Sequence, residues 1–393
     1  MEAQFFGQGD WLSTLLWFII FLIFILFGPR LMVGQTVWRL ERDLQDIEAM
    51  AESTRKIILR RVGKRDRETR AALERFMDFF VVPPVNLDPY GIVKKLDHVL
   101  RNSEERFAEF SSRLLPGAGT VEIRNMKSAL SSALLVHGIA KTVRHFLQLI
   151  KKYKIFQLAF LLQMQLPIIK KLASSSVKAT ESFLSGMPVG DSIGPMVAAS
   201  FMRNPRKSEP EEFVYSVENL EGRRVIFAKA DGPGACVGKP GKFIEKICRR
   251  YRISRLVTVD AAGKLEGERT GSVAEGVGIA MGGPGVDRYE IEETVSRLGI
   301  PVDAIVIKQD PQEDVIVPMK PEIYSALEDA RAAVVEAVKR APEGSTVLVL
   351  GVGNTSGVGN DSSSVDLALK KLKRVRPRSS PSSGRKRILR GIR

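Results

Sequence analysis

The sequence predicts an α/β protein with an N-terminal transmembrane helix, a helical region, and then an open, mostly parallel α/β/α sandwich. Three observations lead to this prediction. An uncharged apolar run stands near the start of the chain, helical periodicity fills the next stretch, and short β-branched runs then alternate with helical patterns and glycine-rich turns. We therefore divide the chain into a transmembrane anchor at 1–30, a helical region at 31–185, an α/β domain at 186–360 and a basic disordered tail at 361–393.

The predicted anchor is the uncharged run at residues 11–29. As a helix it would span about 28 Å, which is enough for the hydrocarbon core of a bilayer. The first ten residues contain Glu2 and Asp10 but no basic residue, unlike the basic start of a signal peptide. Basic residues follow the run, so the positive-inside rule places the N-terminus outside and the C-terminal domain in the cytoplasm. We expect a single-pass protein of the cell membrane, with the lipid bilayer as the partner of residues 11–29.

The helical region begins with a seam in which apolar residues alternate at spacings of three and four. The seam contains Val37, Leu40, Leu44, Ile47, Ala51, Thr54 and Ile58. This spacing suits either a coiled coil or the inner stripe of a bundle helix, and three heptads with Ala and Thr in the seam favour core packing. The oligomeric state stays open.

Further helices are predicted from Asp88-Pro89 to about Leu115 and from Thr120 onward. Residues 155–169 form a second apolar stretch, which is too short for another span and contains Pro167. Lysines flank it on both sides, so it suits either burial in the bundle or a position flat on a lipid surface.

The α/β texture begins after a polar linker at 203–212. Apolar, β-branched runs at 224–230, 255–260, 302–308 and 346–350 predict strands, each bounded by Gly, Pro, Asp or another turn former. Helices are expected between them at 240–251, 289–298 and from Pro321 onward. The alternation of strands and helices favours a mostly parallel sheet that is covered on both faces.

The charge is concentrated at the C-terminus. Residues 370–393 carry eleven Lys or Arg and no acid, and so account for most of the net charge of +15. This composition predicts disorder and contact with anionic lipid or RNA, or else a merely solubilising terminus. The two cysteines form no CxxC pair, which suits a reducing cytosol, and the three histidines all fall in the helical region without the spacing of a metal site.

Candidate chemical groups follow the predicted strands or open a helix. Asp231, Asp260 and Asn354 come at or just after strand ends, and Asp191 lies in a Gly-Asp-Ser segment that opens a helix. Asp191 and Asp260 suit a carboxylate pair that activates water or holds a cation, whereas each alone also suits a turn or an N-cap. No Walker-A pattern and no GxGxxG after a strand is present, so a nucleotide is not specifically indicated. The cofactor and any metal stay unknown.

The order of these motifs resembles the superfamily of hydrogenase-maturation endopeptidases and the spore germination protease. The resemblance runs from the segment 191–197 through the strands that precede Asp231 and contain Asp260, the glycine-rich segment 276–286, and the strand and helix that follow. It covers roughly residues 186–339 together with the last strand. It implies a peptidase-like fold, in which Asp191 and Asp260 match two aspartates on which the germination protease is thought to rely. The whole chain also resembles an uncharacterised archaeal family of membrane-anchored proteins.

Two departures from that superfamily are visible. In those peptidases a strand ending in G-x-G-N leads directly into the Asp motif, whereas here the matching strand, 346–350, closes the domain. A circular permutation would explain this order and would bring Asn354 beside Asp191. The nickel-binding histidine of the hydrogenase peptidases is also missing, because residues 186–360 contain no histidine.

Two functions from different classes follow. The first is a membrane-anchored hydrolase of peptidase type, with Asp191 and Asp260 as the catalytic pair. In this hypothesis the substrate is placed by Lys264, Glu266, Glu268, Asn354 and Asp231. The second is a non-catalytic ligand-binding or scaffold protein on the same fold, held at the membrane.

Overall fold

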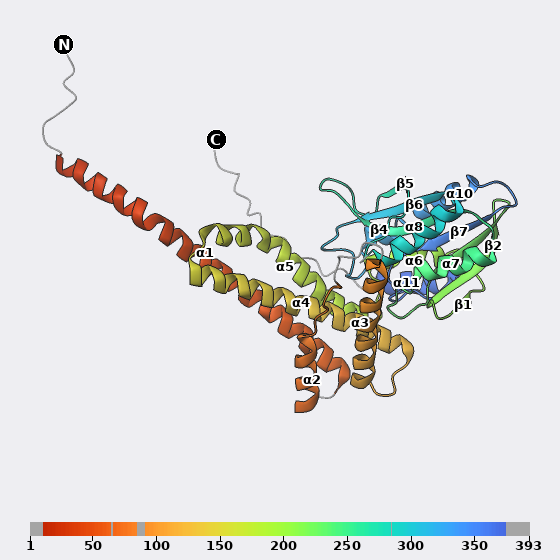
Figure 1. The fold of residues 1–393 in the computed structure, drawn as a ribbon, viewed down its shortest axis with the longest axis horizontal. Coiled ribbons are helices and arrows are strands. Elements are labelled where there is room, and N and C mark those ends of the chain that lie inside the picture. The colour runs from red at the N-terminus through yellow and green to blue at the C-terminus, as the bar shows by residue number, and fades with distance from the viewer. Residues whose placement is uncertain (1–10, 64–65, 85–90, 284, 375–393) are drawn as a thin grey trace, which may run out of the picture. The chain divides into compact units, whose positions relative to one another are not determined.

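The structure is a computed structural model (Figure 1) that describes the chain apart from residues 1–10, 64–65, 85–90, 284 and 375–393, and apart from the side chains of 11–13, 24 and 26–33. The chain forms two compact units. The helical unit contains residues 1–80 and 129–181, and the α/β unit contains residues 81–128 and 182–393. Residues 81–128, which the sequence groups with the helical region, thus belong with the α/β unit.

Four helices make up the helical unit, two of which also extend into the other unit. They are α1 (Trp11–Val62), α2 (Arg67–Met77), α4 (Thr120–Tyr153) and α5 (Phe156–Leu184). The seam of α1 is buried at Leu40, Leu44, Ile47, Ala51, Thr54 and Ile58. Several of these residues share one apolar cluster with residues of α4 and α5, which confirms that the seam packs in a core. Lys170 of α5 adds ion pairs to Asp43 and Asp46 of α1, each at 2.7 Å.

The apolar stretch at 155–169 is divided between core and surface. Leu162 and Leu166 are buried, whereas Phe160 and Met164 are more than half exposed. The stretch therefore forms an amphipathic part of α5, and the turn of helix around Pro167 is retained.

The predicted transmembrane helix is not supported. Across the residues that the structure describes, no helix combines the length and the apolar character that crossing a membrane requires. Residues 11–29 instead form the start of α1, a single helix of 52 residues that continues through the charged segment after residue 38. The predictions of a membrane anchor and of a single-pass protein in the cell membrane are therefore wrong.

The α/β unit is built on a seven-stranded sheet with the order β1-β2-β3-β7-β4-β6-β5. The four strands β3, β7, β4 and β6 are parallel, and the outer pairings are antiparallel. The strands are β1 (Arg206–Ser208), β2 (Phe213–Leu220), β3 (Arg223–Ala230), β4 (Ile253–Gly263), β5 (Val273–Val277), β6 (Val302–Gln309) and β7 (Thr346–Gly351).

Helices cover both faces of this sheet. Buried side chains of α6, α9, α10 and α11 pack on one face, and those of α7 and α8 pack on the other. Their bounds, with those of α3 and of the 3₁₀ turn η1, are α3 (Ile92–Leu114), η1 (Gly190–Ser192), α6 (Ile193–Ala199), α7 (Pro240–Arg250), α8 (Val286–Leu298), α9 (Pro321–Tyr324), α10 (Leu327–Lys339) and α11 (Ser362–Arg374). The α/β part of the predicted fold class is confirmed, with antiparallel strands added at both edges.

The last strand occupies the centre of the sheet. β7 lies between β3 and β4 and is parallel to both, with Leu348 paired to Ile226 on one side and Leu256 on the other. Residues 347–350 are fully buried, because side chains that point to opposite faces of the sheet both meet covering helices. The prediction that 346–350 forms an interior parallel strand is confirmed.

Three local predictions need correction. The predicted linker at 203–212 contains β1, and the helix that opens at Pro321 is divided into α9 and α10. The tail predicted to be disordered from 361 begins with α11, in which Val365, Ala368 and Leu372 are buried against the sheet core. Its last residues, 375–393, and the predicted helix start at Asp88-Pro89 lie outside the described residues.

Candidate active site

Asp191 lies in the 3₁₀ turn η1, immediately before α6. The backbone N–H of Asp191 donates to the Val315 carbonyl at 2.8 Å, and the Gly190 carbonyl accepts a hydrogen bond from Gln309 Nε2 at 3.0 Å. The Ser192 hydroxyl donates to the Ser356 carbonyl at 3.2 Å. Contacts from three separate segments thus fix the orientation of this turn.

Helix α6 crosses the backbone of the central strands at very short range. A Cβ atom on Gly194 would lie 2.2 Å from the Val352 carbonyl oxygen and 2.4 Å from the Val259 carbonyl oxygen. No side chain other than hydrogen fits there, so Gly194 is needed for the close approach. The approach brings the Asp191 turn to the carboxyl edge of β4 and β7, where ligands bind in open α/β sheets.

Asp260 lies on β4, one residue beyond the last residue of that strand that pairs with β7. β7 ends at Gly351, which pairs with Val259, and the N–H of Val352 still donates to the Val259 carbonyl at 2.8 Å. The Asp260 side chain is only 4 % exposed, and its Oδ1 accepts a hydrogen bond from the Ala261 N–H at 2.6 Å. A buried carboxyl with so few donors is poorly stabilised in its charged form.

Asp191 and Asp260 both line one cavity of about 370 Å³. The walls of this cavity are mostly apolar or glycine, and they are contributed by Phe213, Val237, Gly238, Pro240, Ala261, Met281, Gly282, Gly283, Val315, Gly351, Val352 and Gly353. A third carboxyl, that of Asp287 in the first turn of α8, also lines it. The convergence of Asp191 and Asp260, which are far apart in sequence, is what the sequence analysis expected.

The two carboxyls affect each other's protonation. Burial raises the pKa of Asp191, although the Asn354 N–H that donates to its Oδ2 acts in the opposite direction. Burial also raises the pKa of Asp260, to well above its usual range, and the negative charge of Asp191 raises it further. Two carboxyls coupled in this way lose their protons in separate steps, so one is an acid while the other is already a base.

Asn354 contacts the site through its backbone. Its N–H donates to Asp191 Oδ2 at 2.8 Å, while its side-chain Oδ1 accepts from the Ser356 N–H at 2.9 Å and so stabilises its own turn. The prediction that Asn354 comes beside Asp191 is confirmed, but through the main chain. The asparagine side chain is already engaged within the loop.

The loop that carries Asn354 is anchored by buried polar side chains. The Thr355 hydroxyl donates to the Gly234 carbonyl at 2.7 Å, and Lys229 Nζ donates to Asn360 Oδ1 at 2.9 Å. Lys229 is completely buried, and this burial lowers its pKa to about 7. These contacts give the loop a defined position at the carboxyl edge of β3 and β7.

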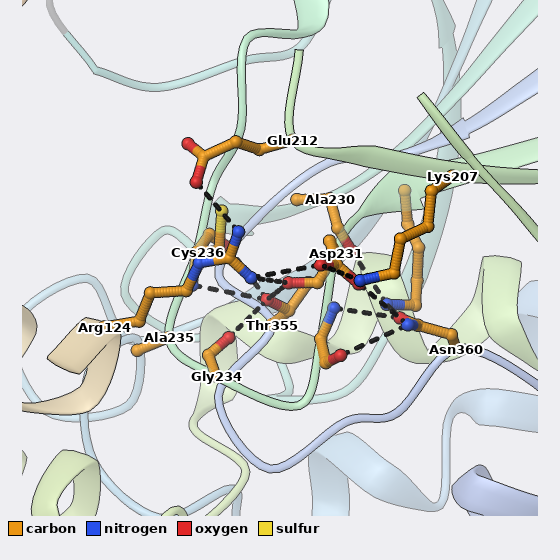
Figure 2. A network of polar contacts seen from close by, with 12 residues as sticks. Arg124, Lys207, Glu212, Ala230, Asp231, Gly234, Ala235, Cys236, Thr355 and Asn360 are labelled. Atoms are coloured by element: carbon orange, nitrogen blue, oxygen red, sulfur yellow. Dashed lines mark hydrogen bonds and ion pairs between the residues drawn. The ribbon is translucent and has the colours of Figure 1, made fainter. Parts of the chain in front are cut away.

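Asp231 does not line the cavity. It belongs instead to the anchoring network, whose contacts Figure 2 shows. Its Oδ2 accepts from Arg124 Nη1 and Lys207 Nζ, each at 3.2 Å, and its Oδ1 accepts from Asn360 Nδ2 at 2.9 Å. Burial would raise the pKa of Asp231, but these donors outweigh it and hold the pKa below its usual value. Arg124 also pairs with Glu212 at 2.8 Å, so the network ties the first turns of α4 to the sheet.

The remaining predicted substrate residues lie on a turn after β4 and do not line the cavity. Lys264 Nζ donates to the Glu268 carbonyl at 3.2 Å, and the Glu268 carboxylate pairs with Lys308. Glu266 is exposed. The structure therefore brings Asp191, Asp260 and the Asn354 backbone together, and leaves Asp231, Lys264, Glu266 and Glu268 outside.

The sequence analysis did not single out Asp287. The available signal was an acid in the first turn of a helix directly after the glycine-rich segment 276–286, but its position in the cavity depends on how α7 packs on α8. Within the part of the chain that the structure describes, no three His, Cys, Asp or Glu side chains are grouped as ligands for one metal ion.

Comparison with known proteins matches the chain to two family models that together cover most of its length. Residues 14–186 match the model described as the N-terminal domain of a protein of unknown function (DUF1512), and residues 189–359 match the model of the DUF1512 C-terminal domain of unknown function. No curated protein and no solved structure matches.

Proposed function

The chain belongs to the DUF1512 family. From the geometry of the site we propose that the α/β unit is a hydrolase of peptidase type with a two-aspartate site. The observation that carries the proposal is the shared cavity of Asp191 and Asp260, in which each carboxyl has a raised pKa and the two are coupled. Pairs of titratable groups whose environments separate their pKa values are typical of acid–base catalysis.

The roles of the two carboxyls follow from their environments. Asp191 ionises first, because the Asn354 N–H stabilises its carboxylate. The negative charge of Asp191 then raises the pKa of the buried Asp260 further and keeps Asp260 protonated, so Asp191 is the base and Asp260 the acid. Asp191 takes a proton from a water molecule whose oxygen attacks the carbonyl carbon of the substrate. Asp260 gives its proton to the leaving nitrogen as the C–N bond breaks, and the two carboxyls exchange protonation states.

The resemblance to the two-aspartate peptidases supports the proposal. The central position of β7 is the slot that a permuted first strand would fill, and the loop after β7 brings the Asn354 backbone to Asp191. We therefore propose that the domain is a circularly permuted relative of that superfamily.

The test is peptide hydrolysis by the full chain, measured by mass spectrometry on a mixed peptide library. Asp191→Asn and Asp260→Asn should each lower the rate by about 100-fold or more, because each removes one partner in proton transfer. Glu292→Gln is the matched control, since Glu292 lies on the exposed surface of α8 and pairs with Arg288. Hydrolysis that persists in both aspartate variants would refute the proposal.

A second candidate, a non-catalytic ligand-binding domain, is favoured by one observation. Within the described part of the chain, the cavity lining contains no Lys, Arg, His, Asn or Gln side chain that could stabilise an oxyanion. Saturable ligand binding by the wild-type chain without turnover of any peptide would select this candidate.

A further inference from the structure

The cavity has an unusual balance of charge. Among the residues that the structure describes, its ionisable lining consists of Asp191, Asp260 and Asp287, and no basic side chain lines it. The remaining walls are apolar or glycine. An anionic ligand would meet like charges along this lining, whereas a ligand with a positive charge would meet complementary ones.

Asp260 supplies a second indication of a ligand. The residue is 96 % buried and lines the cavity. Its carboxyl accepts one hydrogen bond among the described residues, from the neighbouring Ala261 N–H to Oδ1, which leaves Oδ2 unpaired there. Oδ2 is not among the described polar atoms that are sealed from solvent without a partner. It is therefore open to the cavity, where a ligand or water can satisfy it.

Asp287 is placed where a substrate group could be recognised. It lies in the first turn of α8, and its Oδ1 accepts only a long hydrogen bond, 3.4 Å, from the Gly241 N–H at the start of α7. Burial raises the pKa of Asp287, and the negative charges of Glu104 and Asp97 raise it further, whereas the Gly241 N–H and the positive charge of Lys242 lower it.

Lys242, whose positive charge acts on Asp287, is already paired with another acid. Lys242 Nζ lies 3.5 Å from Asp97 Oδ2, and Asp97 is also paired with Arg101. The Asp287 carboxyl therefore has no ion-pair partner of its own among the described residues. A positively charged group in the cavity would supply one.

The spacing of the carboxyls argues for an organic cation. The three aspartates line a common cavity but do not converge as ligands of one metal ion among the described residues. One ammonium group at Asp287, attached to an apolar body along Phe213, Val237 and Met281, would use both the charge and the walls of the cavity.

We propose that Asp287 is the specificity-determining residue of the site and binds an ammonium group of the substrate, while Asp191 and Asp260 act on a neighbouring amide bond. The action of Asp191 and Asp260 on an amide bond rests on the proposed hydrolase function, whereas the binding of an ammonium group by Asp287 does not. The ammonium is either the side chain of a lysine or the free amino terminus of a peptide.

Binding to the full chain, measured by calorimetry, tests the inference with two pairs of small probes. Nα-acetyl-lysine methylamide against Nα-acetyl-norleucine methylamide isolates the side-chain ammonium, and leucinamide against Nα-acetyl-leucinamide isolates the terminal ammonium. One cationic probe should bind about tenfold or more tightly than its neutral counterpart, as a hydrogen bond between charged groups requires. The pair that shows the difference identifies the source of the ammonium.

Asp287→Asn should abolish this preference, because it removes the charge and keeps the shape, whereas Glu292→Gln on the outer surface of α8 should leave it intact. Asp260→Asn should stop hydrolysis but keep the preference. One outcome is that the chain binds a cationic probe more tightly than its neutral counterpart only when Asp287 is present, and yet cleaves no peptide. In that outcome the ligand class stands and the hydrolase proposal fails. Equal binding of both members of each pair, absence of binding, or an unchanged preference in a folded Asp287→Asn chain would overturn the inference.

Discussion

Replacing Gly353 by alanine should disturb the site through the backbone of Asp191. Gly353 has φ +123°, in the region that L-residues rarely adopt, and an added Cβ would lie 2.1 Å from the Asp191 carbonyl oxygen and 3.4 Å from Asp191 Cγ. The carbonyl is held by the surrounding turn and cannot rotate aside as a flexible side chain would. The chain must therefore either strain or move the Asp191 turn.

The expected cost has two parts. An unfavourable backbone conformation costs about 1–3 kcal/mol, and forcing an extra carbon into a packed site costs a further 1–3 kcal/mol. We expect a loss of about 2–6 kcal/mol in the local stability of the edge formed by β4, β7 and η1. That is a large fraction of the stability of a typical domain, so the variant should also lose peptide hydrolysis.

Hydrogen exchange measured by mass spectrometry is the suitable assay, because the chain has two compact units and need not unfold in one step. Amides of β4 and β7 should exchange faster in Gly353→Ala, while those of α1 keep their wild-type rates. Gly276→Ala is the matched control, since no atom lies within 4 Å of the position of its added Cβ. Wild-type protection of β7 in Gly353→Ala would refute the reasoning.

Three further predictions concern the same unit and the C-terminus. Asp260→Asn should stabilise the α/β unit at pH 7 and above, as followed by thermal unfolding. Because the pKa of Asp260 is raised in the folded chain, the wild-type carboxyl lowers stability as the pH rises from 3.8, the ordinary pKa of an aspartate, through the raised pKa of the folded chain. An unchanged melting temperature would count against a raised pKa. Leu372→Ala should lower the free energy of unfolding in urea by about 2–3 kcal/mol, because Leu372 is buried. Leu367→Ala, on the exposed side of the same helix, should lower it by less than about 0.5 kcal/mol, and equal effects would contradict the packing of α11. Deletion of residues 375–393 should leave the unfolding transition unchanged but weaken binding to anionic vesicles or RNA at low salt. If binding to vesicles and binding to RNA are both fully retained, the tail is passive.

The parts of the fold that could be predicted from the sequence are those with a strong local pattern. Residues 346–350 are apolar and β-prone throughout, so a buried strand was the expected result, and the seam from Val37 to Ile58 has the spacing of a helix stripe. The edge strands carry no such pattern. β1 has the sequence RKS, and β5 contains Gly276 and ends at Val277, which is 92 % exposed.

The misjudged segments contained competing signals. In α11, Val365, Ala368 and Leu372 have helical spacing, but the dense lysine and arginine run after them suggested a disordered tail. At residues 11–29 an apolar run was interpreted as a complete membrane helix, although it forms one part of the longer helix α1. Composition over a short window did not establish where an element begins or ends.

The site was predictable only in part, for a physical reason. The two carboxyls at 191 and 260 follow from motif order and from the rule that ligands bind at the carboxyl ends of strands. Asp231 satisfies the same rule, yet Arg124, from a helix more than 100 residues away, neutralises it. Whether an acid at a strand end faces a cavity or a distant arginine depends on tertiary contacts that no local pattern contains.

The central claim is that Asp191 and Asp260 form one coupled pair, and carboxyl NMR of the full chain tests it most directly. With ¹³C-labelled aspartate, the two resonances are assigned from the Asp191→Asn and Asp260→Asn variants and then followed against pH. We predict that Asp260 titrates well above 3.8 and that its pKa falls when Asp191 is replaced, because a like charge is removed. Titration of both carboxyls near 3.8, each indifferent to replacement of the other, would contradict the account.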